Sequence, residues 1–199
     1  MKRSRLVRTP RRLARLDRQL LSWSVRSRHP HADRVLTVLS GAANNAKLWY
    51  IVAALLAIPG RRRPRGAAAA GLLGMGMASA AVNGPLKFAW RRDRPPAEVL
   101  GLSETLLPLP RTYSFPSGHS ASAFAFATGA GMACPWVALP LTAAAALVAY
   151  SRVHTGVHYP GDAIAGSVIG AGLAPLAVAL VKHRRSCRAP LGAERLAPS

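Results

Sequence analysis

Apolar residues along this chain are gathered into long runs that clusters of basic residues separate. The runs cover residues 42–59, 66–86, 117–133, 136–150 and 160–181, and each contains few charged residues. About 20 consecutive apolar residues suffice to cross the hydrocarbon core of a bilayer. The pattern predicts an all-α integral membrane helical bundle with about five transmembrane helices, whose many Gly and Ala residues favour close helix packing.

The first 34 residues follow a different pattern. Leu13, Leu16, Leu20 and Trp23 fall near one face of a predicted helix, and arginines surround them. An apolar stripe on a basic helix is typical of a helix that lies on a membrane surface. We therefore predict a basic amphipathic segment at 1–34, a membrane-embedded domain at 35–182 and a basic, disordered tail at 183–199.

Charge supports a membrane protein over a soluble one. The 199 residues contain 27 Lys and Arg against 7 Asp and Glu, a net charge of +20, and half of the chain is apolar. In a soluble protein such an excess would favour a nucleic-acid partner. Here the basic residues flank the apolar runs, at 2–34, 61–65, 87–94 and 182–188. We expect a membrane partner and no nucleic acid, and a soluble Ala-rich bundle is the weaker alternative.

Three polar segments interrupt the apolar part, and topology predicts that they meet. The segment KFAWRRDRP follows the second run, PSGH opens the third, and SRVHTGVHYPGD joins the fourth to the fifth. If each run crosses the membrane fully, all three segments lie at the same face. The residues that would converge there are Lys87, Arg94, His119, Arg152, His158 and Asp162.

These residue types suit the chemistry of a phosphate group. Lys and Arg side chains bind multiply charged oxyanions, and a helix that begins near Pro116 would add the backbone amides around Ser117 and Gly118. Two histidines allow one to attack phosphorus while the other protonates the leaving oxygen and later activates water. Asp162, four residues after His158, can hold the imidazole in one tautomer.

The three segments together resemble the type 2 phosphatidic acid phosphatase superfamily. Its pattern is a Lys, six residues and Arg-Pro; then Pro-Ser-Gly-His; then Ser-Arg, five residues, His, three residues and Asp. The matching positions are Lys87 with Arg94 and Pro95, then 116–119, then Ser151, Arg152, His158 and Asp162. The ordered triple is far more specific than any one segment, and the resemblance covers residues from about 66 to 181.

The resemblance implies a role for each matching residue. His158 is expected to be the nucleophile that forms a phosphohistidine, Asp162 its orienting partner and His119 the general acid. The residues expected to hold the phosphoryl oxygens are Lys87, Arg94, Ser117, Gly118 and Arg152. The family mechanism uses no metal, so we expect no cofactor and no metal site.

Neighbouring residues have simpler explanations. Arg91 and Arg92 are predicted to be charges that flank a span, His154 is expected to be structural, and Ser117 could instead only cap its helix. Cys134 and Cys187 lie in different contexts, so we expect no disulfide. Three tryptophans near span ends are predicted to be interfacial anchors: Trp49, Trp90 and Trp136.

The predicted function is a membrane phosphatase for a lipid phosphate monoester or a prenyl diphosphate. Undecaprenyl diphosphate, phosphatidic acid and phosphatidylglycerol phosphate are the candidate substrates, and the motifs do not distinguish them. One alternative is a catalytically silent membrane protein that binds anionic lipids. Another is a tether that binds nucleic acid or anionic membranes through residues 1–34, and this role could coexist with catalysis.

The expected location is a bacterial cell membrane, because a high Ala content with Arg far exceeding Lys resembles proteins of high-GC bacteria. The resemblance implies an active site on the extracytoplasmic face. The basic segments at 61–65 and 182–188 agree, since they lie at the opposite face and basic loops favour the cytoplasm. The basic N-terminus disagrees, because five full crossings place it on the active-site side.

Overall fold

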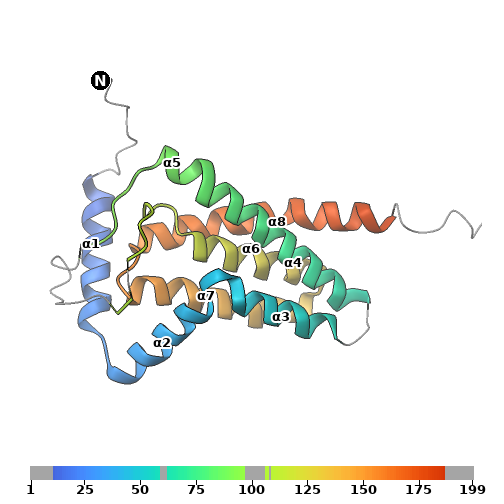
Figure 1. Ribbon diagram of the computed structural model, residues 1–199, viewed down its shortest axis with the longest axis horizontal. Helices are drawn as coiled ribbons and strands as arrows, with labels where there is room; N and C mark the ends of the chain where they lie inside the picture. The colour runs from blue at the N-terminus through green and yellow to red at the C-terminus, as the bar shows by residue number, and fades with distance from the viewer. Residues whose placement is uncertain (1–10, 59–61, 97–105, 108, 187–199) are drawn as a thin grey trace, which may run out of the picture.

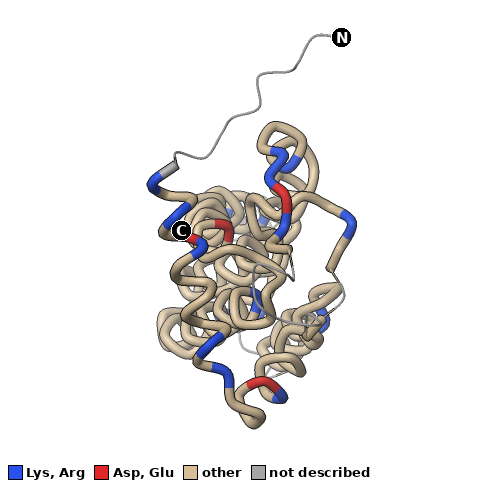
Figure 2. The backbone as a smooth tube through the Cα atoms, turned by 90° about the vertical axis from the view of Figure 1, so that its left-hand side faces the viewer, with Lys and Arg blue, Asp and Glu red and all other residues tan. Residues whose placement is uncertain are grey.

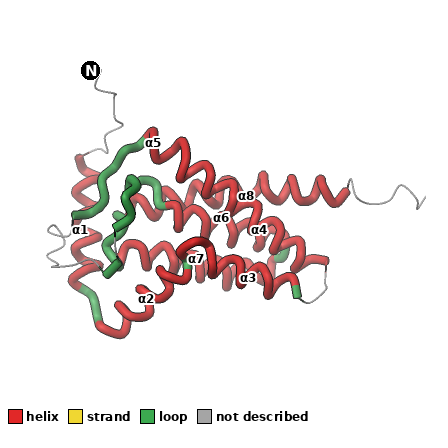
Figure 3. Tube along the Cα trace, viewed as in Figure 1, coloured by secondary structure: helices red, strands yellow, loops and turns green. Residues whose placement is uncertain are grey.

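The computed structural model describes residues 11–58, 62–96, 106–107 and 109–186. This part of the chain contains helices and loops and no strand, which confirms the all-α prediction (Figure 3). The helices are α1 (Arg11–Arg26), α2 (Pro30–Ala42), α3 (Lys47–Ala57), α4 (Arg62–Ala81), α5 (Lys87–Ala89), α6 (Gly118–Ala133), α7 (Ala138–His154) and α8 (Pro160–Ser186). Short helical turns connect some of them: η1 (Asn44–Ala46), η2 (Val82–Leu86) and η4 (Pro135–Val137).

Helix α6 is the centre of the bundle. It packs against α4, α7 and α8, while α3 packs on α4 and α2 packs on α7. Helix α1 lies across one end of the bundle, roughly perpendicular to the long helices (Figure 1). The loops between α5 and α6 lie at this same end (Figure 3). One end of the bundle therefore gathers the irregular segments that can carry a site.

Glycines let α6 approach its neighbours backbone to backbone. A Cβ atom on Gly170 of α8 would lie 2.0 Å from the carbonyl oxygen of Ala121, and one on Gly166 would lie 2.4 Å from that of Ser117. No side chain fits at either position. This agrees with the expectation that small residues bring transmembrane helices together.

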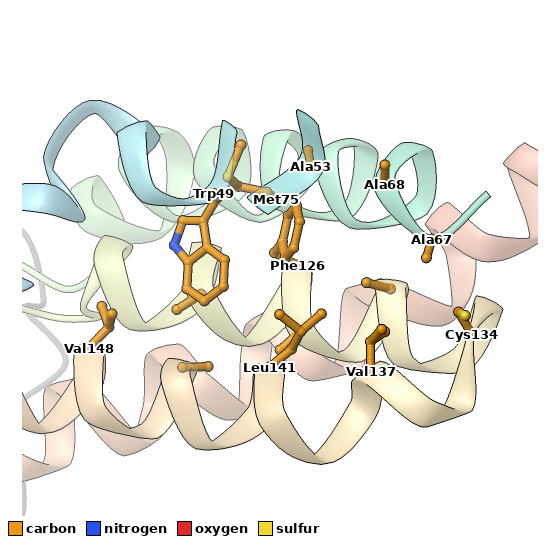
Figure 4. Close-up of a cluster of buried hydrophobic side chains, with 14 of the residues drawn as sticks. Trp49, Ala53, Ala67, Ala68, Met75, Phe126, Cys134, Val137, Leu141 and Val148 are labelled. Atoms are coloured by element: carbon orange, nitrogen blue, oxygen red, sulfur yellow. The ribbon is translucent and has the colours of Figure 1, made fainter. Parts of the chain in front are cut away.

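The main apolar core joins α3, α4, α6 and α7 (Figure 4). The ring of Trp49 packs against that of Phe126, with 5.0 Å between centroids. Trp49 is only 1% exposed, so the prediction that it is an interfacial anchor is wrong. The residue belongs to the core because α3 turns this face toward α6. Trp136, by contrast, is exposed.

In the part of the chain that the structure describes, three helical stretches are long and apolar enough to cross a membrane. They are Arg63–Ala89, Pro135–His154 and Pro160–Arg184, which correspond to the second, fourth and fifth predicted runs. Helices α3 and α6 are shorter, with 11 and 16 residues. The chain therefore has the helices of a membrane protein, and the count of five spans stays a prediction.

The first predicted run, 42–59, is not one continuous helix. Asn45 and Ala46 have φ angles of 53° and 59°, in the left-handed region that breaks an α-helix. These two residues separate α2 from α3, so the helix in this run begins at Lys47. The polar residues within this run thus mark a turn between two helices.

Both ends of the chain differ in detail from the predicted domains. Leu13, Leu16, Leu20 and Trp23 of α1 are each more than half exposed, and its contact with a membrane surface stays a prediction. Leu21 and Val25 are buried against residues of α7 and α8. At the other end α8 continues to Ser186, so 183–186 are helical where a disordered tail was predicted. Residues 1–10 and 187–199 lie outside the described part.

Two glycines of α8 test the close packing. Gly170→Ala is expected to lower the free energy of unfolding by about 1–3 kcal/mol, because the added methyl group must displace the α6 backbone. Gly172→Ala is the matched control, since no atom lies within 4 Å of a Cβ there. Thermal unfolding of the detergent-solubilised protein should show a lower Tm for the first variant alone. Equal Tm values for both would contradict the packing described here.

Candidate active site

A cavity of about 420 Å³ lies near the end of α4, the beginning of α6 and the end of α7. Chain topology explains why distant residues meet there. Lys87 follows the turn η2 after α4, His119 is the second residue of α6, and His158 lies in the segment between α7 and α8. The predicted residues that line the cavity are Lys87, Arg94, Gly118, His119, Arg152 and His158.

Three cations surround this cavity. Lys87 and Arg152 are 8% and 3% exposed. Arg94 is held by backbone oxygens, because its Nε donates to the Thr112 carbonyl and its Nη1 to that of Val157, each at 2.9 Å. Arg152 donates to the hydroxyl of Ser40 on α2. Within the described part of the chain, none of the three forms an ion pair with a carboxylate.

This arrangement leaves positive charge facing the cavity. Burial lowers the pKa of Arg94, which is the expected effect of removing a cation from water. Figure 2 views the molecule from this end and shows basic positions on several separate segments, with acidic positions at only a few places. An oxyanion entering the cavity would find cations already fixed by neutral partners.

The His158 ring presents one nitrogen to the cations and the other to a carboxylate. Its Nε2 lies 3.3 Å from Arg94 Nη1. Since a guanidinium can only donate, this geometry assigns Nε2 as the acceptor and places the proton on Nδ1. Nδ1 lies 3.5 Å from Oδ2 of Asp162. The lone pair of Nε2 therefore faces Arg94, one of the cations that line the cavity.

Burial also keeps this imidazole uncharged. The pKa of His158 is lowered to about 4, chiefly because the buried ring cannot be solvated when protonated. Asp162 acts in the opposite direction, and Arg94 and Arg152 add to the lowering. His158 is consequently neutral near pH 7, the state in which Nε2 can act as a nucleophile.

Asp162 is fully buried and every oxygen is engaged. Oδ2 accepts the backbone N–H of Tyr159 at 2.9 Å, and Oδ1 accepts from Nη1 of Arg92 at 2.8 Å. The prediction that Arg92 is only a flanking charge is therefore wrong. Arg92, in the segment that follows α5, thus reaches Asp162 in the first turn of α8. Arg91 is exposed, as predicted.

His119 and His154 have different surroundings. Nε2 of His119 lies 2.9 Å from Oδ1 of Asn44, a residue of η1 that the sequence analysis did not single out. A polar residue inside an apolar run was the available signal. His154 lies outside the cavity and pairs with Asp33 of α2 at 2.7 Å.

Ser117 serves its own helix. Its buried Oγ accepts the Ser120 N–H at 3.4 Å, and the residue does not line the cavity. The structure thus favours capping, the alternative named for this residue. Gly118 does line the cavity, and a Cβ there would lie 2.7 Å from Oδ1 of Asn83. Its position at the start of α6 leaves its amide free of a helical partner.

No metal cage is found among the acidic residues that the structure describes. Among the described residues there is no group of three His, Cys, Asp or Glu side chains that could hold a metal ion. Asp162, the carboxylate beside the cavity, is already occupied by Arg92 and a backbone amide. Independence from metal stays a prediction for experiment.

Sequence comparisons find lipid phosphatases among the relatives. The undecaprenyl-diphosphatase of Sulfolobus acidocaldarius is 33% identical over 132 residues, which cover 66% of this chain and 62% of that protein. The decaprenylphosphoryl-5-phosphoribose phosphatase of Mycobacterium tuberculosis is 33% identical over 129 residues, covering 62% of this chain and 66% of that protein. The alignments thus span just under two thirds of each relative.

Solved structures share the fold. A transmembrane PAP2 type phosphatidylglycerolphosphate phosphatase from Bacillus subtilis superposes with a TM-score of 0.66 at 22% identity, over 92% of this chain and 90% of that one. LpxE of Aquifex aeolicus gives 0.63 at 25% identity, over 82% and 95%. The profile of the PAP2 superfamily matches residues 68–186, more than half of the chain. Together with the geometry of the cavity, this match establishes that the chain belongs to the PAP2 superfamily.

Proposed function

We propose that this protein is a membrane phosphatase that removes phosphate from a lipid phosphate monoester or a prenyl diphosphate through a phosphohistidine on His158. The orientation of His158 carries the proposal: Nε2 faces the cations and Nδ1 faces Asp162. A protein that only binds anionic lipids needs the cations. It has no use for a neutral histidine backed by a buried carboxylate.

In the first step Lys87, Arg94 and Arg152 bind the phosphoryl oxygens and offset the charge that spreads over them in the transition state. The Nε2 lone pair of His158 forms a bond to phosphorus as the bond from phosphorus to the leaving oxygen breaks. The imidazolium form of His119, stabilised by the negative charge of the bound phosphate, gives its proton to that oxygen and becomes neutral imidazole. Asp162 stabilises the positive charge that the phosphorylated imidazole acquires.

In the second step water regenerates the enzyme. His119, now without its proton, accepts one from a water molecule as that water attacks phosphorus. The bond between phosphorus and Nε2 breaks, and its electron pair returns to His158. Inorganic phosphate is released, and both histidines return to their starting protonation states.

The shape of the site supports an amphiphilic substrate. A second cavity of about 470 Å³, lined by α3 and α4 residues such as Met75 and Gly76, shares Tyr50, Ser79 and Asn83 with the first. A lipid could place its phosphate among the cations while its chain leaves between α3 and α4. Two relatives are named for prenyl-linked substrates, an undecaprenyl-diphosphatase and a decaprenylphosphoryl-5-phosphoribose phosphatase. These names support an amphiphilic substrate here as well. Undecaprenyl diphosphate, phosphatidic acid and phosphatidylglycerol phosphate are the candidates.

We place the protein in a bacterial cell membrane with the cavity facing outward. Arg63 and Lys182 line a common pocket at the other end of α4 and α8. Basic residues favour the cytoplasmic side, which supports this orientation. The arginines of α1, at the cavity end, argue against it.

Phosphate release from detergent-solubilised protein tests the histidine roles. In the presence of EDTA, His158→Ala is expected to lower kcat by about 10⁴-fold or more, because the nucleophile is lost. His119→Ala should cost about 10²–10⁴-fold, and Asp162→Asn should cost less than His158→Ala. His31→Ala is the control, because this exposed histidine lies outside the cavity. Activity that EDTA abolishes, or that survives in His158→Ala, would overturn the proposal.

The charge state of His158 can be measured without substrate. Protein labelled with ¹⁵N-histidine should show a neutral His158 ring with its proton on Nδ1, and the ring should become protonated only near pH 4. Because the folded pKa lies below the usual value of about 6.5, protonation occurs as the pH falls well below that value. The spectrum of His158→Gln assigns the signal. A midpoint at pH 6.5 or above would contradict a buried, neutral nucleophile.

A further inference from the structure

One guanidinium links the active-site carboxylate to the N-terminal helix. Arg92 donates from Nη1 to Oδ1 of Asp162 at 2.8 Å and from Nη2 to Oδ2 of Asp17 at 2.7 Å. Asp17 belongs to α1, and Asp162 to the first turn of α8. The side chains of Arg92 and Asp17 are 16% and 11% exposed, and that of Asp162 is fully buried. The pairs are thus largely shielded from solvent.

Asp17 also binds the backbone next to Asp162. Its Oδ1 accepts the amide N–H of Gly161 at 2.7 Å, one of the helix-start donors that have no partner within α8. A Cβ at Gly161 would lie 2.8 Å from this carboxylate, which shows how closely Asp17 approaches the backbone there. The Asp17 carboxylate therefore binds both Arg92, which contacts Asp162, and the backbone next to Asp162.

The guanidinium of Arg92 has little freedom to move. It stacks on the ring of Tyr159, 4.0 Å from the centroid, while the Tyr159 amide binds the other oxygen of Asp162. A fully buried carboxylate without a cation would be costly to keep ionised. Arg92 supplies that cation on the side away from His158 and leaves Oδ2 facing Nδ1.

We propose that Asp17 and Arg92 are positioning residues for the His158–Asp162 pair, so that α1 is part of the catalytic apparatus. This inference rests on the proposed phosphatase function. Neither side chain lines the cavity, so neither touches the phosphoryl group. Their effect falls on the step in which His158 gains positive charge, because Asp162 must then be ionised and correctly oriented.

Steady-state kinetics on the full-length protein separate positioning from substrate binding. Asp17→Asn and Arg92→Ala are each expected to lower kcat by about 10–100-fold, the usual effect of losing a group that orients a ligand or base, with KM nearly unchanged. Guanidinium ion added at millimolar concentration should restore part of the kcat of Arg92→Ala. A merely structural defect would not respond to guanidinium.

A matched carboxylate provides the control. Asp33 on α2 also ties an N-terminal helix to the end of α7, through His154, but it does not contact Asp162. Asp33→Asn should therefore keep the kcat of the parent protein. The inference would be overturned if Arg92→Ala kept the kcat of the parent protein. It would also be overturned if Asp33→Asn lost as much kcat as Arg92→Ala and guanidinium did not rescue Arg92→Ala.

A second readout does not depend on turnover. In ¹⁵N-histidine-labelled protein, Arg92→Ala should shift the Nδ1 signal of His158, because the facing carboxylate is displaced, and Asp33→Asn should leave it in place. An unshifted signal in Arg92→Ala would also overturn the inference. If the parent protein releases no phosphate from any lipid while the signal shifts as expected, the proposed function fails and the positioning contact stands.

Discussion

Buried positive charge at one end of the bundle is the constraint on which the site depends. Lys87, Arg94 and Arg152 surround one cavity, and within the described part of the chain none is paired with a carboxylate. Neutral oxygens from Thr112 and Ser40 hold their donors in place. The fold thus holds these cations close together although they repel one another. The negative charge of an entering phosphate would offset that repulsion. The same charge helps to keep His158 neutral.

Close helix packing allows this charge to be held rigidly. Because Gly166 and Gly170 carry no side chain, α8 meets the backbone of α6 directly, and the beginnings of these helices lie together. The Ser117 amide donates to the carbonyl oxygen of Asp162 at 3.0 Å, which joins the helix that carries His119 to the one that carries Asp162. Glycine positions deep in the bundle therefore set the geometry at its end.

The sequence predicted the part of the site whose residues lie at short, regular spacings along the chain. His158 and Asp162 are four residues apart, and hydropathy predicted the helices that deliver the other motifs to one face. Arg92 was misassigned because its partner Asp17 is 75 residues away, and no periodic pattern reveals such a contact. Trp49 was misassigned because its burial depends on Phe126 in another helix. The predicted five spans need a membrane experiment, since the length and composition of the described helices support three.

The proposed mechanism requires that His158 carries the phosphoryl group during turnover. The most direct measurement is to mix the protein with a lipid phosphate, quench in alkali within the first turnover, digest it and locate phosphate by mass spectrometry. We expect a phosphoryl group on His158 in the parent protein and none in His158→Ala. Full turnover with no phosphorylated His158, or with phosphate on another residue, would contradict it.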